Sequence, residues 1–317
     1  MAISFEGRVA VVTGAGGGIG RAHALEIARR GGKVVVNDLG GDCHGGGGGS
    51  QMALDVVEEI RSFGGTAIAD GNSVATTEGA NAIVANAVAE WGRLDVLINN
   101  AGIIRNSLLA EMSDDDWDLV IATHLTGSFK LTRAAWPHMQ AQGYGRLVYT
   151  CSSTAMFGVA TMGNYAAAKG GIMGLVHTAS HEGREHGILV NAILPNAITR
   201  LAMEAAKSWE DKGGAPSPGL PPEVGNSMNP EFNMPIAVYL ASEACTDTHG
   251  LYSQCVGRTA KLIVGLGEGW QAQRQSPPSA EDVAAHWDEI CALPDGVTVP
   301  GSPTDELIHV LMSGPGA

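Results

Sequence analysis

The sequence lacks the closely spaced cysteines that a zinc cluster or a disulfide framework requires. No run approaches the ~20 uninterrupted apolar residues of a membrane span, and Met1–Glu6 contains no basic and apolar signal region. We therefore expect a cytoplasmic protein without a metal site. We also expect free thiols at all five cysteines, namely Cys43, Cys151, Cys245, Cys255 and Cys291.

Positive charge is also scarce, because 19 Lys and Arg residues face 33 Asp and Glu residues, for a formal net charge of −14. Nucleic acid and anionic membranes both need positive potential at the contact surface, so neither is predicted as a partner. A small anionic ligand stays open, since it needs only a local basic patch.

Candidate strands and helices alternate along the chain, which predicts an α/β fold with a doubly wound parallel sheet. At 317 residues the chain can bury a full core. Gly41–Ser50 contains five successive glycines and is predicted to be a mobile loop. The other expected elements are Thr66–Ala69, Ala80–Trp91, Leu94–Asn99, Trp117–Met139, Gly145–Cys151, Tyr165–His186, Leu189–Leu194, Pro235–Ala241 and Gly250–Arg258.

A strand, a glycine turn and a helix follow one another near the N-terminus. Val9–Thr13 is apolar, Gly14–Gly20 is rich in glycine, and Arg21–Ala28 has a helical composition. Glycines let the backbone approach a pyrophosphate at the helix N-terminus, where unpaired N–H groups favour anions. A flexible turn without a ligand would have the same composition. The next strand therefore distinguishes a dinucleotide-binding turn from a flexible one.

That strand, Lys33–Asn37, is followed by Asp38, 18 residues beyond Gly20. An acid near this position accepts hydrogen bonds from the adenosine ribose and repels the 2′-phosphate of NADP. Neither Leu39 nor Gly40 supplies a compensating cation. We therefore predict NAD as the cofactor; the alternative is that Asp38 only caps a turn.

Tyr165 and Lys169 are four residues apart in an alanine-rich segment, so both should project from one helical face. A nearby ammonium favours the phenolate and can lower the tyrosine pKa from ~10 by roughly 1–3. Ser152 follows the apolar run Gly145–Cys151, at the end of a strand where sites tend to lie. Taken alone, a tyrosine and a lysine at this spacing are most often a common surface pair, so the other motifs have to support the catalytic interpretation.

Together these features resemble the classical short-chain dehydrogenase/reductase family. The family's cofactor turn matches Thr13-Gly14-(x3)-Gly18-Ile19-Gly20, its strand-four motif matches Asn99–Gly102, and its catalytic set matches Ser152 with Tyr165-(x3)-Lys169. The resemblance implies reversible hydride transfer between a secondary alcohol and a nicotinamide. Tyr165 would then exchange the hydroxyl proton, Lys169 would lower its pKa and bind the nicotinamide ribose, and Ser152 would orient the substrate oxygen.

Within the family, the likeness is greatest to the (3R)-hydroxyacyl-CoA dehydrogenases of the multifunctional peroxisomal type, also known as 17β-hydroxysteroid dehydrogenases. Val34–Asp42, Ala134–Met139 and Pro195–Ala197 carry this likeness, which covers residues 5–270. It implies a hydroxyacyl-CoA or a hydroxysteroid as the substrate. Basic residues flanking the expected entrance would suit CoA, or are only solvated charges: Arg105, Arg200, Lys207 and Lys212.

The resemblance also implies the cofactor contacts. In two places the chain departs from the family pattern: Asn72 stands where an aspartate usually contacts adenine, and Asn196 replaces the usual glycine after Pro195. Asparagine tolerates similar turn conformations, so the contacts beyond it can survive. The implied cofactor-binding residues are Gly14, Gly18, Ile19, Gly20, Asp38, Asn72, Ser73, Asn100, Tyr165, Lys169, Ala197, Ile198 and Thr199.

A third departure is His124, which stands where most members have an asparagine in the helix after strand four. We count it with the catalytic candidates, since a ring nitrogen could hold a water of a proton relay. The alternative is a histidine that only packs within its helix.

The expected organisation is one NAD-binding domain over residues 1–270, with a substrate lid at about 199–234 of irregular structure, and a C-terminal extension over 271–317. In the extension, Ser279–Ile290 reads as one capped amphipathic helix that could dock through Val283, Trp287 and Ile290. The last residues should be poorly ordered unless a neighbouring subunit holds them.

We therefore predict an NAD-dependent oxidoreductase that interconverts a secondary alcohol and a ketone. Alternatives are another small or hydrophobic alcohol as the substrate, an enzyme of related fold that epimerises or dehydrates, and a non-catalytic NAD-responsive binding protein. The long helices Trp117–Met139 and Tyr165–His186 match those through which the family pairs subunits, so a homodimer or homotetramer is expected.

Overall fold

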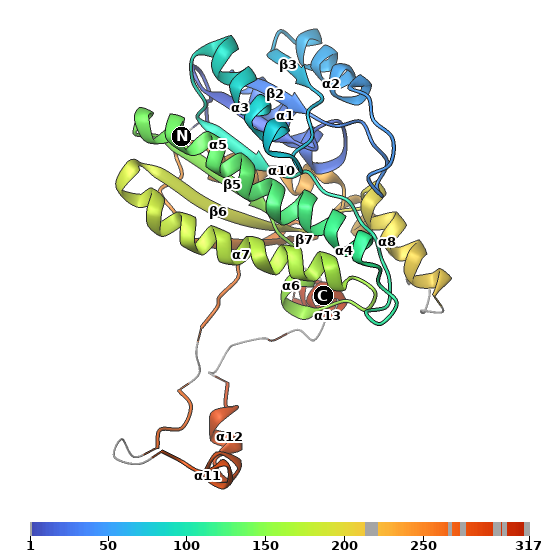
Figure 1. The fold of residues 1–317 in the computed structure, drawn as a ribbon, viewed down its shortest axis with the longest axis vertical. Coiled ribbons are helices and arrows are strands. Elements are labelled where there is room, and N and C mark those ends of the chain that lie inside the picture. Colours follow the sequence, from blue (N-terminus) through green and yellow to red (C-terminus); the bar gives the residue numbers. More distant parts are fainter. Residues whose placement is uncertain are drawn as a thin grey trace.

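The computed structural model describes residues 2–212, 221–265, 268–272, 277–293, 299 and 303–313. Within these residues, eight strands form one sheet in the order β3-β2-β1-β4-β5-β6-β7-β8 (Figure 1). Neighbouring strands are parallel up to β7, and β8 runs antiparallel to β7. The predicted doubly wound parallel sheet is therefore confirmed.

The first six strands agree with the predicted ranges to within two residues. The predicted single strand Gly250–Arg258 was wrong, because the chain reverses at Val256 and Gly257, whose φ angles are 49° and 77°. Two successive positive φ angles suit a tight hairpin turn. The strands are β1 (Val9–Thr13), β2 (Lys33–Asn37), β3 (Thr66–Asp70), β4 (Val96–Asn99), β5 (Gly145–Thr150), β6 (Ile188–Pro195), β7 (Gly250–Cys255) and β8 (Arg258–Lys261).

Helices cover both faces of the sheet, and alternate strand residues point to opposite faces. Val9 and Val11 of β1 pack in one apolar core, while Ala10 and Val12 pack in the other. The first core includes α3 (Thr77–Trp91), α5 (Gly127–Gln142) and α7 (Gly163–Gly183); the second includes α1 (Gly18–Arg29), α2 (Gln51–Ser62) and α10 (Met234–Ala241). Burial on both faces explains why the central strands are continuously apolar.

The predicted helix Trp117–Met139 contains a change of helix type. α4 (Asp114–Ile121) passes into the π-helical turn η1 (Ala122–Thr126), which continues as α5. His124 lies in this π turn. Such turns inside α-helices occur often at functional sites.

The segment predicted as an irregular lid contains regular structure. Arg200–Asp211 forms helix α8, and the Thr199 hydroxyl caps it by accepting a hydrogen bond from the Ala202 N–H at 3.2 Å. The prediction was wrong here because it was drawn from the glycines and prolines that follow Asp211, whereas Arg200–Asp211 itself is capped and amphipathic. Short helices follow at α9 (Pro222–Asn226) and η3 (Pro230–Phe232).

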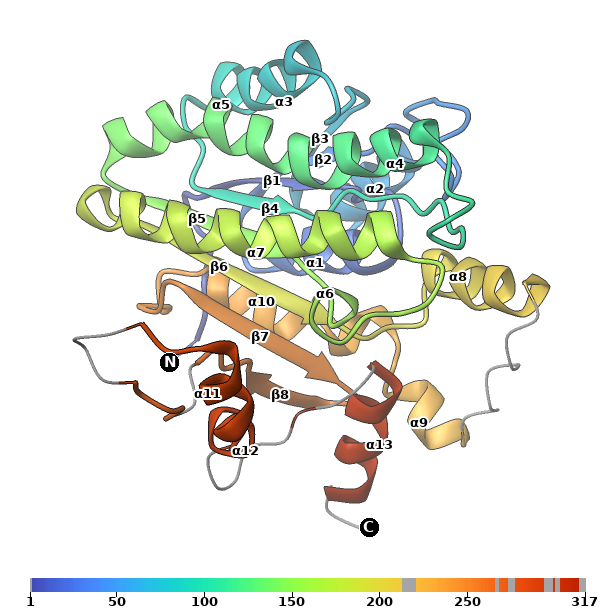
Figure 2. The same ribbon diagram turned by 60° about the horizontal axis from the view of Figure 1, so that its bottom comes forward.

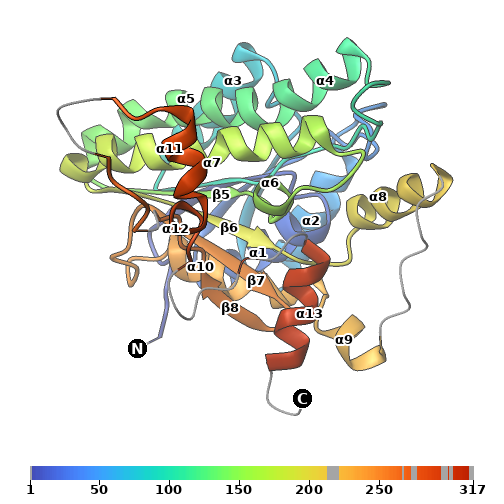
Figure 3. The same cartoon turned by 90° about the horizontal axis from the view of Figure 1, so that it is seen from below.

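The C-terminal extension contains α11 (Ala280–Ala285), α12 (Trp287–Ile290) and α13 (Pro303–Ser313), where the sequence predicted one helix. Figure 1 shows α11 and α12 away from the sheet, and Trp287 is 57% exposed, so the predicted docking of this segment is not seen. Figures 2 and 3 show α13 beside the β7–β8 edge. There Ser253 of β7 donates a hydrogen bond to the buried carboxylate of Glu306.

Two short elements complete the chain: α6 (Thr154–Phe157) lies between β5 and α7, and η2 (Arg184–His186) follows α7. All five cysteines are free, as predicted. In the part of the chain that the structure describes, no helix has the length and apolar character to cross a membrane.

Candidate active site

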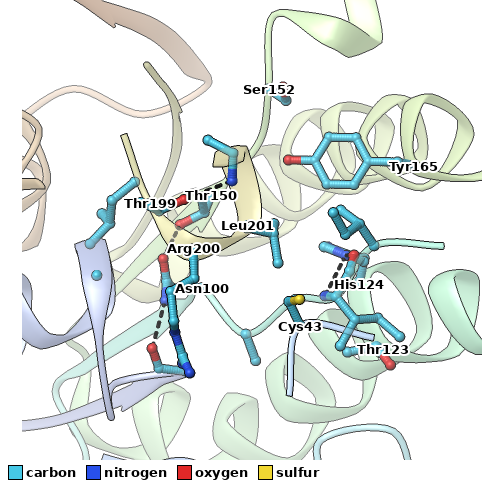
Figure 4. Close-up of a pocket in the computed structure, with 18 of the residues that line it drawn as sticks. Cys43, Asn100, Thr123, His124, Thr150, Ser152, Tyr165, Thr199, Arg200 and Leu201 are labelled. Atoms are coloured by element: carbon cyan, nitrogen blue, oxygen red, sulfur yellow. Dashed lines mark hydrogen bonds between the residues drawn. The ribbon is translucent and has the colours of Figure 1, made fainter. Parts of the chain in front are cut away.

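A cavity of about 520 Å³ opens at the carboxyl ends of the parallel strands. Chain order reverses between β1 and β4, and ligands of doubly wound folds bind at such a reversal. Ser152 reaches the cavity from the end of β5 and Tyr165 from the start of α7 (Figure 4). Lys169, four residues further along α7, also lines the cavity. The candidate residues on its wall are Gly14, Gly18, Ile19, Asp38, Asn72, Ser73, Asn100, His124, Ser152, Tyr165, Lys169, Ala197 and Thr199.

Two of the candidate cofactor residues do not line the cavity. Gly20 faces the glycine turn itself, since a Cβ there would lie 2.3 Å from the Gly14 carbonyl oxygen. Ile198 is 41% exposed, and its N–H donates to the Met228 carbonyl at 2.8 Å. Gly20 thus serves close packing of the turn, and the Ile198 side chain points away from the site.

Burial controls the ionisation of the catalytic candidates. It raises the pKa of Tyr165 to about 12, while the Ser152 hydroxyl acts in the lowering direction. It also lowers the pKa of Lys169 to about 8. The expectation that Lys169 holds the phenol pKa below its ordinary value was therefore wrong for the protein by itself. Removing the phenolate from water disfavours it more than the polar neighbours favour it.

Lys169 is fixed by its surroundings. Its ammonium Nζ donates to the Thr150 carbonyl at 2.5 Å and lies 5.5 Å from the centre of the Tyr165 ring. The Lys169 carbonyl accepts from the Cys151 thiol at 3.1 Å. The end of β5 thus holds the start of α7 in place, with Ser152 as the next residue of the chain.

His124 is 2% exposed and packs edge-on against the Tyr165 ring, with ring centres 5.1 Å apart. Its Nε2 lies 2.7 Å from the Ile103 carbonyl oxygen and 3.0 Å from the Ile103 N–H. Burial, together with the charge of Lys169, lowers the pKa of His124 to about 3, so the ring is neutral. The short carbonyl contact favours the tautomer with its proton on Nε2, and Nδ1 then presents a buried lone pair that has no partner among the residues the structure describes.

Gly102 explains how this histidine fits. A Cβ at Gly102 would lie 2.3 Å from His124 Cε1, so only glycine leaves room for the ring. Both alternatives for His124 therefore stay open. The ring packs within the protein, as expected for a structural histidine, and the residue also lines the cavity, where Nδ1 could accept a hydrogen bond from a water.

The glycine turn has the geometry of an anion cradle. Gly14 and Gly18 have φ angles of 63° and 54°, which favour glycine. α1 begins directly after Gly17 without a side-chain cap, so its first N–H groups are free to meet a phosphate. The amide of Asn100 donates to the Thr13 and Gly14 carbonyls at 2.9 and 3.2 Å. Asn100 therefore braces the turn from the neighbouring strand β4.

Asp38 completes this cradle at the end of β2. Its carboxylate accepts from the Gly16 N–H at 2.8 Å and from the Gly40 N–H at 2.7 Å. A Cβ on Gly16 would lie 2.8 Å from the carboxylate, so the turn and the acid are matched in shape. The residues present fit a nicotinamide dinucleotide, whose ribose an acid here would hold.

The wall expected to face adenine is held by a buried acid that the sequence analysis missed. Asp70, at the end of β3, accepts from the side-chain amides of Asn37, Asn72 and Asn86 at 2.7, 3.0 and 2.6 Å. Ser73 accepts from the Ala75 N–H at 3.2 Å. The predicted strand stopped one residue before Asp70, and the amides that donate to Asp70 come from separate elements. This network therefore could not be predicted from local sequence.

The segment after β6 follows the prediction only in part. Asn196 does not adopt positive φ, so it is not a direct replacement for a left-handed glycine. Its N–H and carbonyl instead pair with the side-chain amide of Asn233 at 3.2 and 3.1 Å. Ala197 and Thr199 still face the cavity.

The basic residues expected at the entrance have different surroundings. Arg105 donates to the His44 carbonyl at 2.7 Å and pairs with Asp116 at 3.1 Å. Arg200 lies at the glycine turn, with Nη2 3.8 Å from Met52 Sδ and 3.8 Å from where a Cβ on Gly17 would be. Arg200 therefore suits a pyrophosphate, whereas Lys207 and Lys212 are exposed.

Comparison with known proteins agrees with this site. A family model described as short chain dehydrogenase matches residues 8–211. The chain is 41% identical over 290 residues to the peroxisomal multifunctional enzyme type 2 of Mus musculus, covering 91% of this chain and 37% of that protein. It is 39% identical over 271 residues to a hydroxyacyl-CoA dehydrogenase of Mycobacterium tuberculosis, covering 81% of this chain and 80% of that protein.

A solved structure gives the same picture of the fold. The crystal structure of a short chain dehydrogenase from Mycobacterium avium superposes with a TM-score of 0.75 at 34% identity, covering 92% of this chain and 98% of that chain. The likeness therefore extends well beyond the glycine turn and the catalytic candidates.

Proposed function

This chain belongs to the short-chain dehydrogenase family and is an oxidoreductase acting on CH–OH groups; from that premise we propose that it is an NAD-dependent dehydrogenase of (3R)-hydroxyacyl-CoA thioesters. The supporting observation is one cavity that joins Ser152, Tyr165 and Lys169 to a glycine turn and to Asp38. The relative named as a hydroxyacyl-CoA dehydrogenase favours the thioester. A hydroxysteroid, or another hydrophobic secondary alcohol, is the second candidate.

The cofactor would be held by the turn Gly14–Gly20, by Asp38 on the adenosine ribose and by Arg200 on the pyrophosphate. When bound, a nicotinamide supplies the carbon that accepts or gives the hydride. Asn72, Ser73 and Asn100 shape the adenine and ribose walls. Ala197 and Thr199 lie at the other end, beside the start of α8.

The proton is handled by Tyr165. Because burial raises its pKa, the resting side chain is a phenol that can give its proton to a ketone oxygen in the reductive direction. In the oxidative direction the phenol first has to lose that proton, and the charge of Lys169 favours the phenolate so formed. Ser152 donates a hydrogen bond that orients the substrate oxygen. His124 offers its Nδ1 acceptor to a water at the same end.

The lid of this enzyme would be residues 199–234, within a domain of residues 1–270 to which the extension 271–317 is attached. Leu201 and Ala205 of α8 line the cavity, as does Pro303 at the start of α13. The exposed Lys207 and Lys212 on the α8 side offer charge to the phosphates of a CoA thioester.

A substrate panel tests the proposal. NADH absorbance is followed with NAD or NADP against (3R)- and (3S)-hydroxyacyl-CoA thioesters, steroid alcohols and small alcohols. We expect the highest kcat/KM with NAD and a (3R)-thioester. A steroid alcohol with higher kcat/KM would transfer the assignment to the second candidate, and absence of redox chemistry with every substrate would overturn it.

Assembly as a homodimer or homotetramer is part of the proposal. α4 and α5 carry Trp117 and Phe129 at 39% and 44% exposure, large apolar side chains that a subunit contact would cover. Contacts on the outer face of α7 would hold Tyr165 and Lys169 in register. Light scattering should report two or four chains, and a fully active monomer would contradict this expectation.

The cellular location also belongs to the proposal. The sequence favours the cytoplasm, while the mouse relative is named as peroxisomal. Imaging of the tagged full-length protein in its own cells, with the tag placed at either end in turn, separates the two locations.

A further inference from the structure

We propose that Cys43, His44 and Glu204 form a binding site for a divalent transition metal such as Zn²⁺, where the loop after β2 meets α8. One ligand atom from each residue lies within 4.8 Å of the other two. Cys43 and His44 are 160 residues away from Glu204 in the chain, so only the fold brings them together. None of the three has a role in the proposed reaction.

The histidine and the carboxylate already have the separation that a metal needs. His44 Nε2 lies 3.4 Å from Glu204 Oε1. In a tetrahedral zinc site, with Zn–N and Zn–O bonds of about 2.0–2.2 Å, the two ligand atoms are roughly 3.4 Å apart. A cation placed between them would therefore meet both at ordinary bond lengths.

The other ring nitrogen of His44 fixes the ring for this purpose. His44 Nδ1 lies 3.1 Å from the Ile104 carbonyl oxygen. With the proton on Nδ1 donated to this carbonyl, Nε2 presents its lone pair toward Glu204. Metal-binding histidines nearly always give their second nitrogen's proton to such an acceptor, which sets the tautomer and the ring orientation.

The backbone around Cys43 is also held. Its carbonyl accepts from the Ile104 N–H at 2.8 Å, and Asp42 accepts from the N–H groups of His44 and Gly46 at 2.9 and 2.8 Å. A tetrahedral site needs the sulfur within about 3.6 Å of the histidine nitrogen. The sulfur lies within 4.8 Å of the nitrogen, so closing the distance takes at most about 1.2 Å, which a rotation of the cysteine side chain can supply.

The ligand chemistry selects the metal. A thiolate and a carboxylate together neutralise a divalent cation, and the thiolate and imidazole favour zinc or cobalt over Mg²⁺ and Ca²⁺, which prefer oxygen ligands. A simple ion pair between His44 and Glu204 would leave Cys43 without a part. Of the three residues, Cys43 lines the cavity (Figure 4).

A bound metal would join the Cys43 loop to α8. Both segments line the cavity, through Cys43 on one side and Leu201 and Ala205 on the other. Occupation of the site should therefore restrict movement of α8 and slow the release of a bound dinucleotide. This consequence rests on the proposed function, whereas the metal site does not.

Cobalt binding to the purified full-length protein tests the site directly. Metal-free protein titrated with Co²⁺ should develop a thiolate-to-cobalt charge-transfer band at one metal per chain. Cys43→Ser should abolish this band, while Cys291→Ser, at an exposed free cysteine, should keep it. His44→Gln and Glu204→Gln should each weaken Zn²⁺ affinity, measured by chelator competition, by at least roughly 10-fold.

A second control tests whether another pair of histidines contributes to metal binding. His177 of α7 and His249 stack with ring centres 4.3 Å apart, and neither belongs to the group of Cys43, His44 and Glu204, so His177→Gln should leave metal binding unchanged. A band that survives in Cys43→Ser, or Zn²⁺ affinity lost in His177→Gln but not in Glu204→Gln, would overturn the site.

The link to dinucleotide release is measured separately, from NADH fluorescence after dilution. Zn²⁺ should slow NADH dissociation from the parent protein and not from Glu204→Gln. An unchanged rate with the metal bound would overturn the connection between the loop and α8. Failure to bind NADH at all would count against the proposed function and not against the metal site.

Discussion

The two ends of the cavity differ in whether their buried polar groups have hydrogen-bond partners within the protein. At the dinucleotide end, the acids at the strand ends are paired: Asp38 accepts two backbone N–H groups, and Asp70 accepts three side-chain amides. Asn100 donates to two carbonyls of the glycine turn. The acids and Asn100 at this end are thus held in place in the protein by itself, while the first N–H groups of α1 stay free to meet a phosphate.

At the catalytic end, ionisable groups are buried without full compensation. Burial raises the pKa of Tyr165 to about 12 and lowers that of Lys169 to about 8, and both changes disfavour the charged forms. The Nδ1 atom of His124 is buried and has no partner among the described residues. Burying ionisable groups without partners costs free energy. Such burial is characteristic of a functional site, where bound ligands complete the polar contacts.

This difference indicates that the dinucleotide end determines cofactor affinity and that the catalytic end determines the turnover rate. A preformed dinucleotide cradle should keep its affinity when a catalytic group is altered. At the catalytic end, burial disfavours the charged forms of the ionisable groups. Removing one of these groups should therefore lower the turnover rate and change the cofactor affinity little.

The largest expected effect follows from removing the Tyr165 hydroxyl. Tyr165→Phe should lower turnover by at least roughly 100-fold, because it deletes the proton donor and acceptor and keeps the ring that packs against His124. NAD affinity, measured by calorimetry, should stay nearly unchanged. Undiminished turnover in the folded variant would falsify the assigned acid and base.

Tyr149→Phe is the matched control for this variant. Tyr149 is fully buried, and its hydroxyl pairs with Thr132 Oγ1 at 2.5 Å, outside the cavity wall. The variant should lose about 1 kcal/mol of stability through this hydrogen bond and keep its turnover. An equal loss of turnover in both variants would mean that packing, and not proton transfer, is affected.

The next effect concerns the dinucleotide end. Asp38→Asn should lower the ratio of kcat/KM with NAD to kcat/KM with NADP by about 10- to 100-fold, because hydrogen bonds to a charged group contribute about 1.5–3 kcal/mol. Loss of the charge also ends the repulsion of the 2′-phosphate, and Arg200 lies close enough to the turn to attract it. Steady-state kinetics with both cofactors measure the ratio.

Asp42→Asn is the control for cofactor choice. Asp42 also accepts two backbone N–H groups, but in the loop beyond Gly40 and not at the turn. The cofactor ratio of this variant should equal that of the parent. A parent protein that uses NAD and NADP with equal efficiency would remove Asp38 as the selecting residue.

The same division explains what the sequence could predict. Much of the dinucleotide end comes from one stretch of the chain: Val9–Thr13, the glycine turn, and the strand Lys33–Asn37 with Asp38 directly after it. Local composition and spacing therefore predicted the sheet and the placement of these residues on one cavity. The helix α8 was missed although its sequence is amphipathic and capped by Thr199, because the glycines and prolines that follow Asp211 made the whole segment read as irregular.

The electrostatics of the catalytic end could not be predicted in the same way. The spacing of Tyr165 and Lys169 gave their shared face, but the sign of the change in the Tyr165 pKa depends on burial by distant elements. The contact of His124 with Ile103 and the room left by Gly102 likewise depend on tertiary packing. The Cys43–Glu204 group joins segments that no spacing rule connects.

The smallest expected effect concerns a residue that is an exception to the contrast between the two ends. His23 lies in α1, at the otherwise well-paired dinucleotide end, yet it is fully buried, and neither ring nitrogen has a partner among the described residues. Burial lowers the pKa of His23 to about 3, and burial, followed by the charge of Lys169, does the same for His124. Each end therefore has one histidine that stays neutral in the folded protein.

Both histidines should make the fold sensitive to acid. Below the ordinary histidine pKa of about 6.5, the unfolded chain binds a proton on each ring, while the folded protein does not bind it until near pH 3. Their contribution to stability is thus fully present above pH 6.5 and is lost as the pH falls toward 3. At pH 5.5 the loss is about 1.4 kcal/mol for each histidine.

His23→Leu separates the two contributions, because leucine fills a similar volume and binds no proton. Urea unfolding at pH 8 and pH 5.5 should show that the parent loses about 1.4 kcal/mol more stability between these pH values than the variant. The remaining loss in the variant includes that of His124 at the catalytic end. An equal loss in the parent and the variant would mean that His23 is already protonated, or reached by water, in the folded protein. The His23 ring would then no longer be an uncompensated group at the dinucleotide end, and the contrast between the two ends would be sharper.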